Sequence, residues 1–310
     1  MVGAGRGGLP RLRRLPGEDG PRDPRRPRRA EELSAGGGPV VVVTGASDGI
    51  GAAAARRLHR SGAQVVVVGR SAEKTAAVAA ELDGARALTV DLARLDDVRR
   101  LAAQLADLPR VDVLVNNAGA SFAHREVTVD GNERTFQVDH LAPYLLTRLL
   151  EPQLRASRGR VVTTSSFAHW GGASRRGHLA EAVESRPPYV ATRAYARAKW
   201  CNVLFTRELA RRWAPEVTAT CFDPGGVATG FGRAAGGATG VLFRSPLVAF
   251  LRTPAQGADT LVWLATADGG WRDGAHHAHR SRTLTAPSAR DDVRAAELWE
   301  LSARLVGLPA

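Results

Sequence analysis

The stretch that decides the fold of this chain is VVVVTGASDGIG, residues 40–51. Its four valines form a continuous β-branched run, which predicts a strand buried on both faces over 40–43. Helix formers follow over 51–61, so the glycines lie in a turn between a strand and a helix. Such a turn lets the backbone approach a phosphate, to which the helix N-terminus offers N–H donors and a favourable dipole. The spacing is G-x-x-x-G-x-G rather than the G-x-G-x-x-G of many dinucleotide-binding folds.

The same alternation of strand and helix continues along the chain. Apolar, β-branched runs predict strands, and stretches rich in Ala, Leu and Arg predict helices. The predicted strands span 64–69, 86–90, 111–115, 160–164 and 217–222, and the predicted helices span 72–82, 95–108, 131–154 and 192–213. Strands and helices that alternate through short connections form a parallel sheet covered on both faces. We therefore predict an α/β fold, a single doubly wound Rossmann-type domain with ligands at the carboxyl ends of its strands.

The first part of the chain has a different composition. Residues 1–38 are rich in Arg, Pro and Gly and have almost no apolar side chains to bury. Such a composition predicts a disordered tail, which is either a solvated segment or the product of a misassigned start. The domain is expected to span 39–310.

Composition excludes several functional classes. The net charge is +12, but the excess arginines are scattered and form no basic stripe interleaved with aromatic residues, so we expect no nucleic-acid partner. No apolar run approaches the ~20 residues of a membrane helix, and the N-terminus lacks the apolar core of a secretory signal. We therefore expect a cytoplasmic protein without a membrane partner. Cys201 and Cys221 both fall in predicted core elements, which favours buried free thiols over a disulfide.

The end of the second predicted strand indicates which dinucleotide would bind. A site for NAD usually places a carboxylate there to bind the ribose 2′-hydroxyl, whereas an arginine accommodates the 2′-phosphate of NADP. The sequence at this point is Val68-Gly69-Arg70-Ser71, without a carboxylate. Arg70 is therefore a candidate phosphate ligand, and we predict NADP (NADPH) as the cofactor.

Tyr195 and Lys199 form a candidate reactive pair. They lie four residues apart on a predicted helix and so share one face. An ammonium group stabilises a nearby phenolate, which would move the tyrosine pKa toward the working pH. Tyr195 could then exchange a proton with an alcohol or carbonyl oxygen, while Lys199 holds the cofactor ribose.

With these two motifs the chain resembles the short-chain dehydrogenase/reductase family over roughly 40–305. The matching segments are Thr44 to Gly51, the pair Asp91-Leu92, Asn116-Asn117-Ala118-Gly119, Thr164-Ser165-Ser166, Tyr195 to Lys199, and Asp223 to Thr229. The segments 136–141 and 202–210 are similar to those of the retinol dehydrogenase-like and WW-domain oxidoreductase-like branch. Animal members of that branch often carry a membrane anchor before the fold, where this chain has its Arg-rich segment, so no anchor is expected.

The resemblance implies roles for individual residues. It makes Ser166, Tyr195 and Lys199 catalytic, together with Asp139 at the position of the family's catalytic Asn. The residues implied in cofactor binding are Gly45, Ser47, Asp48, Gly49, Ile50, Gly51, Arg70, Asp91, Leu92, Asn117, Ala118, Gly119, Tyr195, Lys199, Pro224, Val227 and Thr229. Family members often form dimers or tetramers through their two long helices, so a homodimer or homotetramer is an expectation of the resemblance alone.

Two departures from the family pattern carry expectations of their own. In the family the main-chain carbonyl of the Asn holds a water that connects to the lysine. Asp139 could keep that carbonyl while bringing a buried charge near Lys199, so we expect activity with a shifted pH profile. The segment 269–282, with His276, His277 and His279, matches the family's last strand poorly. We expect a solvated or lid-facing loop there and no metal site, because no other ligand type accompanies the histidines.

The sequence thus predicts an NADP-dependent oxidoreductase that transfers a hydride between nicotinamide and an apolar alcohol, aldehyde or ketone, acting mainly as a carbonyl reductase. The apolar stretch 230–253 would form a substrate lid. Retinoid, steroid and xenobiotic carbonyls all stay open as substrates. One alternative is a catalytically weak NADP-binding sensor or scaffold, supported only by Asp139. A nucleotide-sugar epimerase or dehydratase is a weaker alternative. Those enzymes resemble T-G-x-x-G-x-x-G at the turn, a spacing that Thr44 to Gly51 does not follow.

Overall fold

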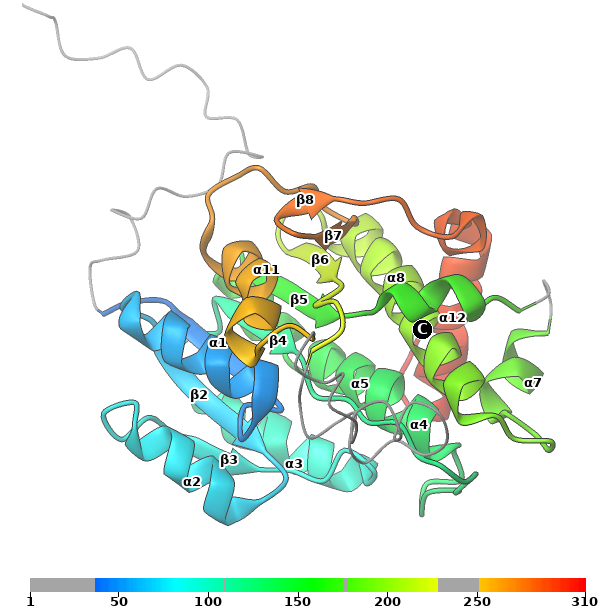
Figure 1. The fold of residues 1–310 in the computed structure, drawn as a ribbon, viewed down its shortest axis with the longest axis horizontal. Helices are drawn as coiled ribbons and strands as arrows, with labels where there is room; N and C mark the ends of the chain where they lie inside the picture. The colour runs from blue at the N-terminus through cyan, green and yellow to red at the C-terminus, as the bar shows by residue number, and fades with distance from the viewer. Residues whose placement is uncertain (1–36, 109, 175–177, 228–250) are drawn as a thin grey trace, which may run out of the picture.

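The computed structural model describes residues 37–108, 110–174, 178–227 and 251–310. Eight strands form one sheet in the order β3-β2-β1-β4-β5-β6-β7-β8, and every neighbouring pair is parallel except β7 and β8 (Figure 1). The strands are β1 Val40–Thr44, β2 Gln64–Gly69, β3 Ala87–Thr89, β4 Val113–Asn116, β5 Arg160–Thr164, β6 Thr218–Phe222, β7 His276–Ala278 and β8 Ser281–Arg282. The predicted α/β class and parallel sheet are confirmed.

Helices cover both faces of this sheet. One face buries residues of α1 (Gly49–Arg60), α2 (Ala72–Ala80) and α11 (Pro254–Thr266). The other face buries residues of α3 (Leu95–Ala106), α5 (Ala142–Leu149), α8 (Ala191–Trp213) and α12 (Asp292–Leu305). Successive valines of β1 contribute to opposite faces, since Val41 packs with the first set and Val42 with the second. The run of valines is thereby explained, because a central parallel strand has no solvent-facing side.

The predicted helix over 131–154 is wrong in its extent and regularity. The structure has α4 (Arg134–Phe136), a π-helical turn (Gln137–Leu141), α5 and then α6 (Glu151–Ala156). Glu133 caps the start, where its carboxylate accepts the backbone N–H groups of Thr135 and Phe136. Pro143 lacks the N–H that a regular helix would direct at the carbonyl of Asp139. This missing donor explains why the helix changes its hydrogen-bond pattern in front of Pro143.

The predicted loop over 269–282 is also wrong. It contains β7, which pairs with β6 so that His276 lies opposite Cys221 and His277 opposite Phe222. Both histidines are buried, with His276 only 5% exposed. Their polarity hid the strand from sequence patterns, but main-chain pairing with β6 and burial under neighbouring side chains stabilise the extended conformation.

Other expectations meet the structure only in part. Cys201 and Cys221 are buried free thiols, as predicted. Across the residues that the structure describes, no helix combines the length and hydropathy needed to span a bilayer. Residues 1–36 and 228–250 lie outside the described residues, so the tail and nearly all of the proposed lid stay predictions.

Candidate active site

The candidate site lies where the sheet order reverses, between β1 and β4. Parallel sheets bind ligands at such a point, outside the carboxyl ends of the strands. The turn after β1 there meets the turn after β4 at very short range. A Cβ atom on Gly45 would lie 2.8 Å from the Cα atom of Ala118, and one on Gly51 would lie 2.2 Å from the carbonyl oxygen of Gly45. A side chain at either position would push the two turns apart, so glycine is required for this close packing, as in the turns that bind dinucleotides.

Asn117 and Thr44 hold the two turns together. The Thr44 hydroxyl accepts the backbone N–H groups of Asn117 and Ala118, at 3.0 and 3.1 Å. The Asn117 amide donates in return to the carbonyl of Thr44, at 3.0 Å. Asn117 is therefore a positioning residue, which follows β4 and holds the glycine turn after β1 in place.

At the start of α1 the N-terminus is capped and free to receive an anion. The Asp48 side chain accepts the N–H of Gly49 at 2.7 Å. The next two N–H groups, of Ile50 and Gly51, have no intrahelical acceptor because they lie in the first turn of the helix. These N–H groups are the donors that a pyrophosphate would accept from.

The end of β2 lies beside the same turn. The N–H of Ala46 donates to the Val68 carbonyl at 2.9 Å, and a Cβ on Gly69 would meet the Ser47 side chain at 2.7 Å. Arg70 follows directly, and its side chain is exposed. Lys74, on α2, approaches Asp48 to 4.0 Å. Arg70 and Lys74 thus both follow the end of β2 that adjoins the turn after β1.

The remaining residues predicted to bind the cofactor are distributed around this crevice. Asp91 and Leu92 follow β3, where the Asp91 carboxylate accepts the N–H of Ala93. Pro224 and Val227 follow β6, and Val227 lies near the glycine turn, because a Cβ on Gly257 would touch both Val227 and Ile50. Thr229 lies outside the described residues.

The reactive residues converge from β5 and α8. Ser166 follows β5 and caps the 3-10 helix η3 (Phe167–Gly171), accepting the N–H of Ala168 at 3.2 Å. Its side chain also hydrogen-bonds the Tyr195 phenol. The Lys199 ammonium lies 5.3 Å from the centre of the Tyr195 ring, one helical turn away on α8. The three side chains predicted to react are therefore brought together.

The titration of Tyr195 differs from the sequence-based expectation. Burial raises the pKa of the Tyr195 phenol above its ordinary value, the Lys199 ammonium opposes this rise, and the carboxylate of Asp139 adds to it. Lys199 does stabilise the phenolate, as expected. In the protein without a ligand, however, this effect is smaller than the effect of burial, so the pKa stays raised. Tyr195 is thus a protonated acid at neutral pH, which is the form that protonates a carbonyl oxygen.

Asp139 forms a buried ion pair with Lys199. The carboxylate is fully buried and its Oδ2 atom lies 2.9 Å from the lysine Nζ atom, while Oδ1 accepts the N–H of Ala120 at 2.7 Å. Burial raises the pKa of Asp139, with Lys199 opposing. Burial lowers the pKa of Lys199, but Asp139 and Tyr195 more than offset this and leave it raised. The lysine is therefore held as an ammonium beside Tyr195.

A buried network around Asn202 escaped the sequence analysis. The Asn202 amide donates to the carbonyls of Asp139 and Thr164, at 3.0 and 3.2 Å, and its Oδ1 atom lies 3.2 Å from His140 Nδ1. The Asp139 carbonyl is available because Pro143 supplies no helical N–H to it. Burial lowers the pKa of His140 to about 4, so its ring is neutral. The sequence does contain a signal for this network: His140 and Asn202 are polar residues on the faces of two predicted helices that pack together.

His169 was also missed, and it positions the segment that carries Ser166. Its Nδ1 atom lies 2.7 Å from the carbonyl oxygen of Ser166, and its Nε2 atom accepts the N–H of Ala286 at 3.3 Å. Burial lowers the pKa of His169, which keeps the ring neutral and able to accept at Nε2. His169 therefore ties the serine loop to the chain that precedes α12.

Comparisons with known proteins agree with this geometry. The family model described as short chain dehydrogenase matches residues 39–176. The chain is 40% identical over 277 residues to "Putative daunorubicin C-13 ketoreductase DnrU" of Streptomyces sp. (strain C5), covering 87% of this chain and 93% of that one. It is 36% identical over 293 residues to human retinol dehydrogenase 13, with coverages of 88% and 86%.

Solved structures have a similar fold. An uncharacterised protein from Mycobacterium paratuberculosis matches with a TM-score of 0.70 and 30% identity, covering 92% of this chain and all of that one. A structure of a "putative NAD(P) dependent gluconate 5-dehydrogenase" from Beutenbergia cavernae, with NADP bound at low occupancy, matches with a TM-score of 0.62 and 30% identity, over 77% and 94% of the two chains. These comparisons support a nicotinamide dinucleotide as the cofactor. This chain belongs to the short-chain dehydrogenase/reductase family of oxidoreductases, in its retinol dehydrogenase-like branch.

Proposed function

We propose that the protein is an NADPH-dependent reductase that converts an apolar ketone or aldehyde to the alcohol. The observation that carries this proposal is the convergence of Ser166, Tyr195 and Lys199 in a sheet whose first strand ends in a closely packed glycine turn. A phenol hydrogen-bonded to a serine hydroxyl and backed by an ammonium is an acid placed to protonate a carbonyl oxygen.

Each residue has a separate task in this proposal. When bound, NADPH supplies the hydride that reduces the carbonyl carbon. Ser166 donates a hydrogen bond to the carbonyl oxygen and orients it. Tyr195 transfers its phenolic proton to that oxygen as negative charge develops, and Lys199 stabilises the phenolate that is left. Asp139 balances the charge of Lys199 inside the protein.

Arg70 and the missing carboxylate after β2 support NADP over NAD. The Arg70 side chain is exposed and stands one residue beyond the strand that adjoins Ser47. An arginine in this place pairs with a 2′-phosphate, whereas a carboxylate would repel it. We propose reduction as the working direction for the same reason, because cells keep NADP mostly reduced.

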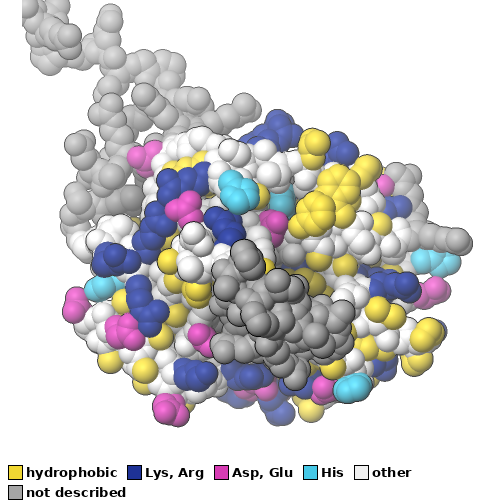
Figure 2. All heavy atoms as spheres, viewed as in Figure 1, with side chains coloured by type: hydrophobic (Ala, Val, Ile, Leu, Met, Phe, Trp, Pro, Cys, Tyr) yellow, Lys and Arg dark blue, Asp and Glu magenta, His cyan; other side chains and the backbone are white. Residues whose placement is uncertain are grey.

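Two exposed aromatic side chains support an apolar substrate. Phe167 and Trp170 lie on η3, directly after Ser166, and are 70% and 43% exposed with their ring centres 6.3 Å apart. The space-filling view shows yellow hydrophobic side chains gathered on this face of the molecule (Figure 2). A relative named as a ketoreductase of daunorubicin, and others named as retinol dehydrogenases, are consistent with a large apolar carbonyl compound.

A second function keeps one observation in its favour. The buried carboxylate of Asp139 forms an ion pair with the lysine that should support Tyr195. If that pair held the phenol proton too firmly, the protein would bind NADPH without turnover and act as a sensor or scaffold.

Purified protein tested with NADPH or NADH and a panel of apolar aldehydes and ketones distinguishes these functions. The measurement is the loss of absorbance of the reduced nicotinamide, with Tyr195→Phe as the matched variant. We expect turnover with NADPH that falls by at least about 100-fold in the variant, since a general acid contributes roughly 10²–10⁴-fold. Tight NADPH binding without turnover in the unmodified protein would instead support the sensor.

A further inference from the structure

A second cavity lies away from the catalytic crevice. It has a volume of about 360 Å³, opens to solvent, and is lined by the second half of α8, the segment before β7, β8 and η5 (Pro287–Arg290). Arg207 of α8 lines it and is 12 residues beyond Tyr195, which is about 18 Å along a helix axis. Volumes of this size are typical of small-molecule sites.

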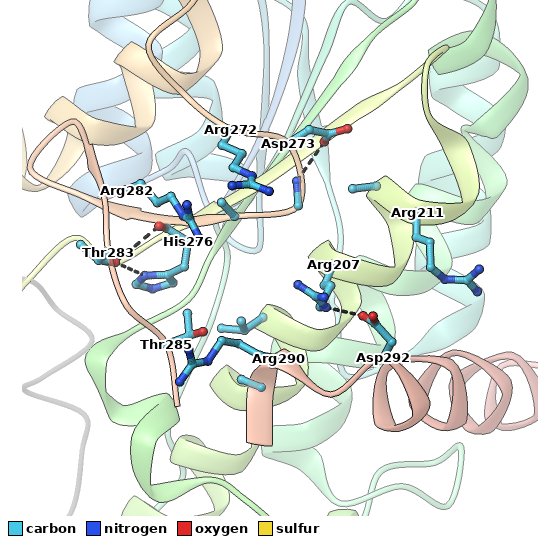
Figure 3. A pocket seen from close by; sticks show the side chains of 15 residues that line it. Arg207, Arg211, Arg272, Asp273, His276, Arg282, Thr283, Thr285, Arg290 and Asp292 are labelled. Atoms are coloured by element: carbon cyan, nitrogen blue, oxygen red, sulfur yellow. Dashed lines mark hydrogen bonds and ion pairs between the residues drawn. The ribbon is translucent and has the colours of Figure 1, made fainter. Parts of the chain in front are cut away.

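Arginine side chains dominate its lining. Figure 3 shows the side chains of Arg207, Arg272, Arg282 and Arg290 around an open space, while the guanidinium group of the fifth arginine, Arg211, points away from it. Two of the five are already paired, since Arg207 contacts Asp292 and Arg211 lies 2.5 Å from Glu208. Arg272, Arg282 and Arg290 have no ion-pair or hydrogen-bond partner for their guanidinium groups in the part of the chain that the structure describes.

Among the described residues, the acidic groups of the cavity form no ion pair with these three arginines. Asp292 is engaged by Arg207, and the Asp273 carboxylate accepts the N–H groups of Ala219 and Gly274, at 2.7 and 3.0 Å. Like charges collected in a concave site repel one another and raise the local positive potential. Arg272, Arg282 and Arg290 are exposed, and the positive potential between their unpaired guanidinium groups favours an anion there.

The lining also includes a buried histidine, His276. It lines the same cavity and is 5% exposed, and its Nδ1 atom lies 2.7 Å from the Thr283 hydroxyl. Its Nε2 atom is buried with no hydrogen-bond partner among the described residues. The ring of His276 also lies 5.0 Å from that of His169, so the imidazole forms part of the packed wall of the cavity.

We propose that this cavity binds a compact polyanion, a small molecule carrying phosphate or carboxylate groups, at a site separate from the dinucleotide crevice. Guanidinium groups bind both kinds of oxyanion through paired N–H donors. The lining contains no Phe, Trp or Tyr among the described residues, so a nucleic-acid base has no stacking platform.

Isothermal titration calorimetry with inorganic pyrophosphate, and separately with citrate, tests the site. The titrations are made in magnesium-free buffer, both without NADPH and with the dinucleotide crevice saturated by NADPH. The double variant Arg282→Gln/Arg290→Gln removes two unpaired guanidinium groups, and Arg272→Gln removes the third. Arg304→Gln is the matched control, because Arg304 is an exposed arginine of α12 outside the cavity.

We expect one anion per chain that still binds in the presence of NADPH. Its affinity should fall by about tenfold or more in the double variant and by less than about twofold in Arg304→Gln. Binding of pyrophosphate but not citrate identifies a phosphate ligand, and the reverse identifies a carboxylate. The proposal is overturned if neither anion binds at millimolar concentration, or if the affinity is unchanged in both cavity variants. It is also overturned if NADPH abolishes binding, because the anion then occupied the dinucleotide crevice.

Discussion

At the scale of single residues, Asp139 sets this chain apart from the family pattern. Its carboxylate is fully buried 2.9 Å from the Lys199 ammonium. An isolated buried carboxylate would be strongly destabilising, so the ion pair and the N–H of Ala120 are both needed to keep it there. The same charge acts on Tyr195, whose phenolate it disfavours.

The substitution Asp139→Asn should shift the pH profile of reduction. Because the carboxylate raises the pKa of Tyr195, removing it lowers that pKa, and the phenol then loses its proton at lower pH. Reduction needs the protonated phenol, so the alkaline limb of kcat/KM against pH should move to lower pH, with activity retained near neutrality. Asp107→Asn, at an exposed position after α3, is the control. An unchanged limb in Asp139→Asn would contradict the role assigned to the carboxylate.

Arg70 should determine which cofactor is preferred. In Arg70→Glu a carboxylate would face the 2′-phosphate in place of a guanidinium. We expect the KM for NADPH to rise at least about tenfold while the KM for NADH changes little, since only NADPH carries the phosphate. Steady-state kinetics with both cofactors measure this, with Arg304→Glu as a control for the change in net charge. Equal losses with the two cofactors would remove Arg70 from the phosphate site.

At the scale of secondary-structure elements, the irregular segment before α5 joins the catalytic helix to the sheet. The π-helical turn Gln137–Leu141 presents the Asp139 carbonyl to Asn202 of α8, which also binds the Thr164 carbonyl at the end of β5. One amide therefore links three elements that carry Asp139, Lys199 and Ser166. A regular helix without Pro143 would use the Asp139 carbonyl internally.

Replacing Asn202 should destabilise the whole domain. Asn202→Leu would leave two buried carbonyls and His140 Nδ1 without this partner, for which we expect a loss of about 2–4 kcal/mol in the free energy of unfolding. Ser302→Ala removes only the contact to His140 Nε2 and should cost about 1 kcal/mol. Urea denaturation measures both. Similar losses in the two variants would show that the amide does not join the elements as proposed.

At the scale of the whole molecule, the cofactor crevice is assembled from segments distant in the chain. The glycine turn after β1, the turn after β4 and the segment after β6 meet there, and α11 packs its Gly257 against Val227 and Ile50. A ligand that contacts all of these segments binds the folded chain only. Binding must therefore raise the stability of the entire domain.

NADPH should accordingly raise the melting temperature. At a free concentration 100 times its dissociation constant, a ligand adds about 2.7 kcal/mol to the free energy of unfolding. For a domain of this size that corresponds to a rise of roughly 5–10 °C. Differential scanning calorimetry at equal concentrations of NADPH and NADH provides the measurement, and NADH should give the smaller rise. A larger rise with NADH would argue against NADP as the cofactor.

Sequence alone determined the features of this protein that local patterns encode. The valine run of β1 and the glycine turn follow from burial and backbone freedom within 12 consecutive residues. Tyr195 and Lys199 share a face because a helix repeats every 3.6 residues. The order of strands and helices then predicted the parallel sheet and the edge at which the reactive residues meet, and both are present.

Tertiary structure alone decided the features that depend on contacts between distant residues. Asp139 and Lys199 are 60 residues apart and meet only because α8 packs against the π-helical turn. The strand containing His276 was invisible to pattern analysis, since main-chain pairing with β6 overrode a polar sequence. The arginine-lined cavity likewise gathers side chains from α8, β8 and η5. Such contacts leave no period in the sequence, because packing, and not local conformational preference, brings the residues together.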